Sequence, residues 1–188
     1  MFERDIIRQL SAWKMDVNRK PLVIHGARQV GKTWALKYFG KVYFEDVAYF
    51  SLDKDESGLC DIFKTTKDPR RIIQQLSFLH GKKINPQTTL LILDEIQECN
   101  EALNALKYFC EEAPEYAVAC AGSLLGIYLN HIGNSFPVGK VNHLSMYPLT
   151  FTEFLKTKDP NMYEYLCFIK EIAPLPQIFF DKLRESFV

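Results

Sequence analysis

The segment Gly26–Thr33, which reads GARQVGKT, has the residue types and spacing of a phosphate-binding loop. Its glycines permit backbone conformations that let successive N–H groups surround phosphate oxygens, and a following helix would turn its positive end to the same anion. Lys32 can reach the β- and γ-phosphates of a nucleoside triphosphate, and the Thr33 hydroxyl can ligate Mg²⁺. The candidate nucleotide-binding residues are Gly26, Ala27, Arg28, Gln29, Val30, Gly31, Lys32, Thr33 and Trp34.

Two adjacent carboxylates follow a wholly apolar run, Leu90–Leu93, and these are Asp94 and Glu95. A buried strand would hold Asp94 at its carboxyl end, where the side chain can orient water bound to Mg²⁺, as the acid of a Walker B strand does. Glu95 would then polarise the water that attacks the γ-phosphate. The structural alternative is a strand that merely ends in exposed acids.

A catalytic Glu95 would also fix the strand order, because it implies a further strand between the one before Gly26 and the one before Asp94. The apolar run at 116–121 is the natural candidate for that strand. Its carboxyl end would bring Ser123 beside the γ-phosphate, as a catalytic sensor that hydrogen-bonds the water or the phosphate. An ordinary turn closed by the Ser123 hydroxyl is the alternative.

Other side chains near these motifs have open roles. Arg28 can contact phosphate, a neighbouring subunit or only solvent, and Gln97 can orient a water or a side chain near Glu95 or cap a surface helix. Trp34 fits packing of a helix against the sheet better than stacking on adenine. No arginine finger is recognised, and Lys140 is a weak candidate substitute.

The elements that must position these residues alternate between short apolar runs and amphipathic segments, the pattern of an α/β fold with a mostly parallel sheet. The run at 88–93 has no polar face, as a strand at the centre of such a sheet requires. Right-handed crossovers would cover both faces with helices. Expected strands are 22–25, 42–52, 88–93, 116–121 and 138–144; expected helices are 2–15, 33–39 ending at Gly40, 68–81, 101–112, 150–156 and parts of 160–188.

The composition of the 188 residues excludes several classes of protein. A hydrophobic share of 47% excludes a disordered tail, and 23 basic against 23 acidic residues make a globally basic nucleic-acid binder unlikely on charge alone. The charges are nevertheless unevenly placed: residues 1–41 hold nine basic against three acidic side chains, and residues 94–115 hold seven acidic against one basic. Such blocks suit a site for an anion and a metal, although most charge blocks are solvated faces.

The cysteines and the N-terminal segment favour the cytoplasm. Five cysteines without a CxxC pair are typical of a reducing compartment. The first ten residues carry charges where a signal peptide needs an apolar core. Residues 116–139 lack charge, but their asparagines, histidine, proline and four glycines fit a buried strand and an uncharged loop better than a membrane span.

Six segments in this order resemble the prokaryotic AAA family ATPases that usually continue into a DUF4143 C-terminal domain: GARQVGKTW, TLLILDEIQE, LKYF, AGSLLGI, SFPVGKV and YPLTFTEFL. The resemblance spans about residues 2–155. It implies a P-loop NTPase of the ASCE/AAA+ type, with a three-layer αβα fold and a five-stranded sheet. It also implies an ATPase domain at 1–155, followed at 156–188 by a helical extension that would start a truncated C-terminal region.

The leading hypothesis is Mg²⁺-dependent binding and hydrolysis of ATP, coupled to an unknown protein or DNA partner. A homo-oligomer is a further possible partner arrangement. ATP is preferred over GTP because no guanine-reading segment follows the loop. The alternative is a nucleotide-dependent binding switch with little hydrolysis. A small-molecule kinase is a third class, but the basic residues at 53–71 stand in a mixed-charge setting rather than in a substrate lid.

Overall fold

The computed structural model describes residues 4–53, 58–123, 139–169, 174 and 176–186. Contacts between Cα atoms divide the chain into two units, which are described separately: Ile6–Pro148, and Leu149–Val188 together with Met1–Asp5. The division falls before helix α7 (Phe151–Lys158). The ATPase domain at 1–155 and the extension at 156–188 stay a prediction.

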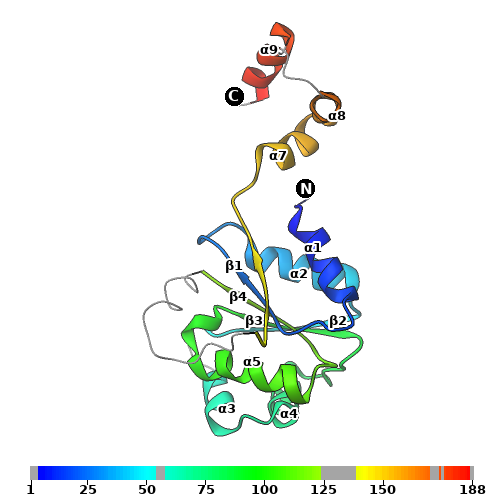
Figure 1. Ribbon diagram of the computed structural model, residues 1–188. Coiled ribbons are helices and arrows are strands. Elements are labelled where there is room, and N and C mark those ends of the chain that lie inside the picture. Colours follow the sequence, from blue (N-terminus) through cyan, green and yellow to red (C-terminus); the bar gives the residue numbers. More distant parts are fainter. Residues whose placement is uncertain (1–3, 54–57, 124–138, 170–173, 175, 187–188) are drawn as a thin grey trace. The chain divides into compact units, whose positions relative to one another are not determined.

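The first unit is built on a five-stranded sheet with the order β2-β3-β4-β1-β5 (Figure 1). The strands are β1 (Leu22–His25), β2 (Asp46–Ser51), β3 (Thr89–Asp94), β4 (Ala117–Gly122) and β5 (Asn142–Ser145). Each pair of neighbours in the described sheet is parallel. Because β4 lies between β1 and β3, the predicted insertion of the 116–121 strand is confirmed.

The two faces of the sheet carry separate hydrophobic cores, because successive side chains of a strand point to opposite sides. Helices α1 (Ile6–Met15) and α2 (Lys32–Tyr43) cover one face, and α3 (Leu59–Thr65), α4 (Pro69–His80) and α5 (Asn100–Glu112) cover the other (Figure 1). Leu90 and Ile92 belong to the first core, and Leu91 and Leu93 to the second. This confirms the three-layer arrangement with helices on both faces.

Local sequence signals explain both ends of α4. Asp68 caps α4 by accepting a hydrogen bond from the Arg70 backbone N–H, and Gly81 ends the helix with a left-handed φ of 75°, as predicted. The predicted end of α2 at Gly40 is wrong, because the helix continues to Tyr43. A Cβ at Gly40 would lie 2.6 Å from Val47 Cγ2, so this glycine serves close packing of α2 on β2 rather than termination.

Two short elements were not predicted. Helix α3 follows Gly58 and has seven residues, and the 3-10 helix η1 spans Ile96–Glu98. Neither is long enough to show a repeating apolar pattern over several turns. The segment 124–138, which includes most of the predicted uncharged loop, lies outside the described residues.

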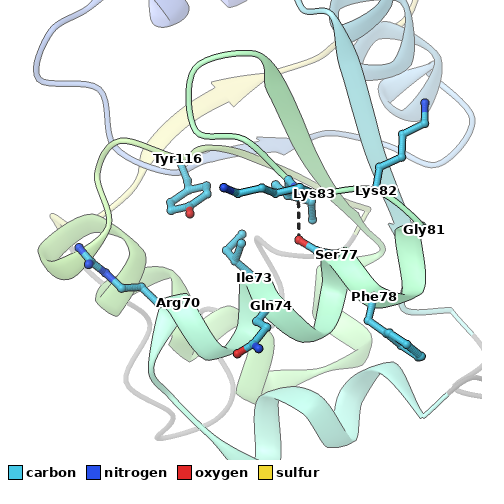
Figure 2. A pocket seen from close by; sticks show the side chains of 10 residues that line it. Arg70, Ile73, Gln74, Ser77, Phe78, Gly81, Lys82, Lys83 and Tyr116 are labelled. Carbon is cyan, nitrogen blue, oxygen red and sulfur yellow. Dashed lines mark hydrogen bonds between the residues drawn. The ribbon is translucent and has the colours of Figure 1, made fainter.

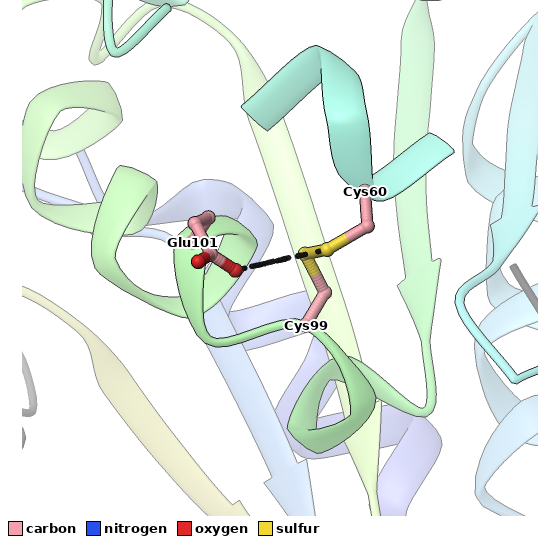
Figure 3. A group of neighbouring side chains, drawn as sticks. All are labelled: Cys60, Cys99 and Glu101. Atoms are coloured by element: carbon pink, nitrogen blue, oxygen red, sulfur yellow. Dashed lines mark hydrogen bonds between the residues drawn. A yellow bond between two sulfur atoms is a disulfide. The ribbon is translucent and has the colours of Figure 1, made fainter. Parts of the chain in front are cut away.

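A disulfide joins Cys60 of α3 to Cys99, which precedes α5 (Figure 3). Both cysteines are buried, and Oε2 of Glu101 lies 3.7 and 3.8 Å from their sulfur atoms. Helix α3 packs against α5, which brings together two residues that are 39 positions apart. The expectation of reduced cysteines is wrong for this pair. The sequence could not predict the contact, because it is made by packing of distant segments and has no sequence motif.

The C-terminal unit consists of α7, α8 (Pro160–Phe168) and α9 (Gln177–Ser186), which confirms the predicted C-terminal helices. Its small core is made by Leu155, Met162 and Phe179. A capping box starts α7, since Thr150 and Glu153 exchange hydrogen bonds with each other's backbone N–H groups.

Glu153 ties the N-terminal residues to this unit. Its Oε1 accepts hydrogen bonds from the Asp5 backbone N–H at 2.8 Å and from Arg4 Nε at 3.1 Å. Burial raises the pKa of Glu153, but the backbone N–H groups of Thr150 and Asp5 and the Arg4 guanidinium outweigh burial and hold the pKa below its usual value. The carboxylate therefore stays ionised although the Glu153 side chain is only 5% exposed.

None of the helices in the described residues combines the length and the apolar character that a membrane crossing requires.

Candidate functional site

The predicted site residues meet at the carboxyl edge of the sheet. Strand β1 leads through the loop Gly26–Gly31 into α2, β3 ends at Asp94, and β4 ends at Gly122. His25 lies opposite Gly122 in the register. Parallel neighbours end at the same edge, so residues that are far apart in sequence converge there, where α/β sheets hold their ligands.

The backbone of the loop needs its glycines. Gly26 has a φ of 155°, and a Cβ on it would lie 2.1 Å from the carbonyl oxygen of Met146, directly after β5. The Met146 N–H donates to the His25 carbonyl at 2.8 Å, which holds β5 against the start of the loop. Gly31 and Gln29 take positive φ values of 95° and 62°. The loop therefore turns sharply enough to present backbone N–H groups to an anion.

Lys32 is the first residue of α2, and its ammonium group is held inside the loop. Its Nζ donates to the carbonyl oxygens of Ala27 at 2.7 Å and Gly26 at 3.0 Å, and the residue is 7% exposed. Burial lowers the pKa of Lys32, while the carboxylates of Glu95 and Asp94 oppose that shift. A buried cation with carbonyl partners is well placed to exchange them for phosphate oxygens.

Asp94 is the centre of an oxygen cluster beside this cation. Its Oδ2 accepts a hydrogen bond from Thr33 Oγ1 at 2.8 Å and from the Tyr49 hydroxyl at 2.9 Å, and its Oδ1 accepts from the Glu95 N–H at 3.1 Å. Burial and the Asp94 hydrogen bond raise the pKa of Tyr49 to about 12, so this phenol stays a donor. A buried carboxylate and a hydroxyl in contact fit the oxygen ligands of Mg²⁺.

Glu95 lies next to the cluster on a constrained backbone. Its φ of 51° is in the left-handed region, which non-glycine residues seldom adopt outside functional or strained positions. Its Oε2 accepts hydrogen bonds from Gln97 Nε2 and, at 3.4 Å, from the Ser123 hydroxyl. The structure thus brings Ser123 to the predicted carboxylate and gives Gln97 the side-chain contact that the sequence left open.

A cavity of about 620 Å³ opens beside these residues. It is lined by Arg28, Gln29, Gly31, Lys32, Thr33, Trp34, Asp53, Glu95 and Glu98. Trp34 is 39% exposed and stacks on Tyr38 with ring centroids 5.2 Å apart, so the expectation that it packs against the sheet is wrong. Trp34 instead contributes to the lining of the cavity.

Arg28 and Lys140 occupy different places. Arg28 is exposed on the loop and lines the cavity. Lys140 comes before β5, at the opposite edge of the sheet, and its Nζ pairs with Glu111 Oε1 at 2.8 Å. Within this chain, Lys140 therefore does not join the loop residues, and Arg28 does.

Sequence reasoning missed Tyr49, Asp53 and Glu98. Strand β2 pairs with β3 so that Ser51 lies opposite Asp94, which carries the end of β2 to the same edge. The sequence did predict a strand at 42–52. Its apolar and polar residues alternate too irregularly, however, to show which side chain would reach Asp94.

The fold and the site define a P-loop-type α/β domain with a strand inserted between its two motif strands. Residues 18–155 match the family described as "AAA domain", and the chain belongs to this family of ATPase-type nucleotide-binding domains. The resemblance to AAA family ATPases inferred from the motifs is therefore confirmed for the ATPase domain, as is the AAA+ fold class.

Two solved structures are similar at low identity. PCH-2 of C. elegans shares 13% identity with a TM-score of 0.46, over 90% of this chain and 48% of that one. AMPPCP-bound DnaA from Aquifex aeolicus shares 15% identity with a TM-score of 0.47, over 93% of this chain and 52% of that one. The chain thus spans about half the length of each. No curated protein matches it.

Proposed function

We propose that this domain binds ATP with Mg²⁺ at the carboxyl edge of the sheet and hydrolyses it. The observation that carries the proposal is the 2.8 Å contact between Thr33 Oγ1 and Asp94 Oδ2 beside the buried Lys32. These groups come from two motifs that are far apart in sequence, and each is the type of group that a Mg²⁺-nucleotide site uses. We assign the activity to residues 1–155, with 156–188 as an extension. The charged N-terminal segment supports the cytoplasm as the compartment, whereas the Cys60–Cys99 disulfide removes the argument from reduced cysteines.

The binding roles follow from the geometry. Backbone N–H groups of the loop and the first turn of α2 would donate to phosphate oxygens, and Lys32 would exchange its two carbonyl partners for the β- and γ-phosphates. Thr33 and Asp94 would hold Mg²⁺, which neutralises charge on the phosphates when bound. Trp34, which lines the cavity, would contact the nucleoside.

The catalytic roles fall on Glu95 and its two partners. Glu95 would orient the attacking water and accept its proton, and Ser123 would sense the water or the γ-phosphate. Among the described residues, Gln97 Oε1 is a buried acceptor without a hydrogen-bond partner. A water molecule that donates to this oxygen while facing Glu95 would be held by two fixed groups, which supports Gln97 as a positioning residue.

Two substitutions test binding and turnover separately. Lys32→Ala is expected to weaken ATP binding at least a hundredfold, and Glu95→Gln to keep binding but lower turnover at least a hundredfold, because it removes the base but not the phosphate contacts. Calorimetry with a non-hydrolysable analogue and phosphate release measure the two effects. Unimpaired hydrolysis by Glu95→Gln would remove the catalytic assignment.

A second candidate is a nucleotide-dependent switch with slow hydrolysis. It is favoured by the engagement of Glu95 with Gln97 and Ser123, which competes with a water for the carboxylate. In addition, Arg28 is the only arginine among the described residues that line the cavity. A second copy of the chain, or a protein or DNA partner, would then complete the cycle. Bound ATP that stays intact for hours in a single-turnover assay distinguishes the switch from the ATPase.

A further inference from the structure

A second cavity, of about 760 Å³, lies at the amino edge of the sheet, because it is lined by residues that precede β3 and β4. Figure 2 shows its lining residues. The cavity is formed by α4, by the segment that connects α4 to β3, and by Tyr116, which directly precedes β4. Its lining is Arg70, Ile73, Gln74, Ser77, Phe78, Gly81, Lys82, Lys83, Ile84 and Tyr116. Its volume is in the range of small-molecule sites.

The lining has a one-sided charge. It contains three cations and no carboxylate. Arg70 reaches Glu115 only at 3.6 Å and Lys82 reaches Asp46 only at 3.8 Å, and no ion pair is found for Lys83 within the described part of the chain. Figure 2 shows Lys83 extending towards the Tyr116 ring, whereas Lys82 points away from it. Lys83 is therefore directly available to a ligand, whereas Arg70 would have to exchange its contact with Glu115 for one to the ligand.

The remaining lining supplies donors and apolar surface. Ser77 Oγ accepts the Ile84 N–H at 3.0 Å, which leaves the Ser77 hydroxyl proton available for donation. Gln74 is exposed and offers an amide. Buried Ile73 and half-buried Tyr116 form apolar walls, and Tyr116 adds an aromatic face.

From this combination we propose that the amino-edge cavity binds a small organic phosphate whose organic part is aromatic. The phosphate would lie between Lys83 and Arg70, because a dianion can engage two cations, and the aromatic part would lie on Tyr116 and Ile73. This site is independent of the proposed nucleotide site, since it shares none of its lining residues.

Phenyl phosphate is the probe, and backbone amide NMR of the full chain is the readout, because it separates the two cavities residue by residue. We expect saturable shifts at Gly81–Ile84 and Tyr116, with an affinity at least fivefold tighter than that of inorganic phosphate at the same amides. The cations are exposed, so raising the salt concentration should weaken this binding several-fold. Shifts at the loop 26–33 report the other site and do not count for this one.

Three variants test the assignment. Lys83→Gln and Arg70→Gln are each expected to weaken phenyl phosphate about two- to fivefold, as exposed charge pairs do, and the double variant at least tenfold. Tyr116→Leu should remove the preference over inorganic phosphate while the rest of the spectrum shows a folded protein. Lys67→Gln is the matched control, since Lys67 is also exposed but lies outside the cavity lining.

Three results would overturn the proposal. They are an absence of saturable shifts at Gly81–Ile84, equal affinity for phenyl and inorganic phosphate, and an effect of Lys67→Gln as large as that of Lys83→Gln. Each of them would indicate that the cations around the cavity contact only solvent and do not form a ligand site. None depends on whether the carboxyl-edge site hydrolyses ATP.

Discussion

The two cavities described above lie at opposite edges of one sheet, and their charged side chains differ in burial. At the carboxyl edge, Lys32 and Asp94 are 7% and 4% exposed and are fixed by hydrogen bonds. At the amino edge, Lys83 is exposed and the Arg70 side chain is 71% exposed. The carboxyl-edge groups are therefore oriented before a ligand arrives, while the amino-edge groups must be ordered by it.

This difference in burial affects both the binding free energy that a ligand gains and the dependence of its binding on salt concentration. Buried charges interact in a low-dielectric environment and are screened little, so a ligand gains strongly from Lys32. A ligand gains little binding free energy from exposed charges, because water and salt screen them. The same sheet thus offers one site suited to tight binding of a highly charged ligand and one suited to weak, salt-sensitive binding.

The largest expected effect concerns the Cys60–Cys99 disulfide, because this cross-link closes a long loop of the chain. Both cysteines lie at the carboxyl edge of the sheet, so the disulfide restrains that edge and not the amino edge. Cys99 directly follows η1, which carries Gln97, and Cys60 anchors that turn to α3. For a cross-link between residues 39 positions apart, replacing both cysteines by alanine should lower the free energy of unfolding by about 4 kcal/mol. Urea unfolding of both proteins measures the change.

Cys167→Ala is the matched control, because Cys167 is a free, exposed cysteine. In the double alanine variant, amide shifts should appear around 95–99 and not around 81–84. Equal stability of the variant and the wild type would contradict a disulfide that supports the carboxyl edge.

The second prediction compares one glycine at each edge. Gly26→Ala should lower the free energy of unfolding by about 3 kcal/mol, or displace the loop and abolish nucleotide binding, because its Cβ would lie 2.1 Å from the Met146 carbonyl oxygen. Gly81→Ala should cost only about 1 kcal/mol, since its φ is 75° but nothing lies within 4 Å of the added Cβ. Thermal unfolding and ATP titration measure both.

A Gly26→Ala protein that binds ATP like the wild type would show that the contact between the loop and β5 is not required. If Gly81→Ala were the more damaging substitution, the contrast between a rigid and an open edge would be wrong.

The contrast also explains what the sequence could predict. The loop Gly26–Thr33 is contiguous, so every residue type and spacing is visible in one segment. Asp94 and Glu95 end a run without a polar face, and the need for a strand beside them correctly placed β4. Features that depend on one segment, or on one rule of sheet topology, were therefore predicted.

Features made by packing between distant segments were not predicted. Tyr49 reaches Asp94 only through the pairing of β2 with β3, and Cys60 meets Cys99 only because α3 packs against α5. Gly40 has the appearance of a helix end, but its role is a close contact with Val47. In each case the local sequence is compatible with several outcomes, and tertiary contact selects one.

The smallest expected effect tests a partly buried charge pair at the amino edge through pH. The hydrogen bond from His80 Nε2 to Asp46 Oδ2, at 2.7 Å, lowers the pKa of Asp46 below its usual 3.8. Because the folded-state pKa is the lower one, the stabilisation is present above about pH 4 and is lost as the pH falls through the folded-state value. Between pH 6 and pH 3, the wild type should lose about 0.5 kcal/mol more than Asp46→Asn in urea unfolding.

His80→Gln should remove most of the same pH-dependent difference, and the double variant should remove no more, because both substitutions break one hydrogen bond. Neither should change ATP affinity, since Asp46 begins β2 at the amino edge while the loop lies at the carboxyl edge. If both single variants kept the full pH dependence of the wild type, the Asp46–His80 pair would contribute nothing to stability. If instead ATP affinity fell with them, the two edges would be coupled through β2, and the separation of a rigid site from an adaptable one would have to be abandoned.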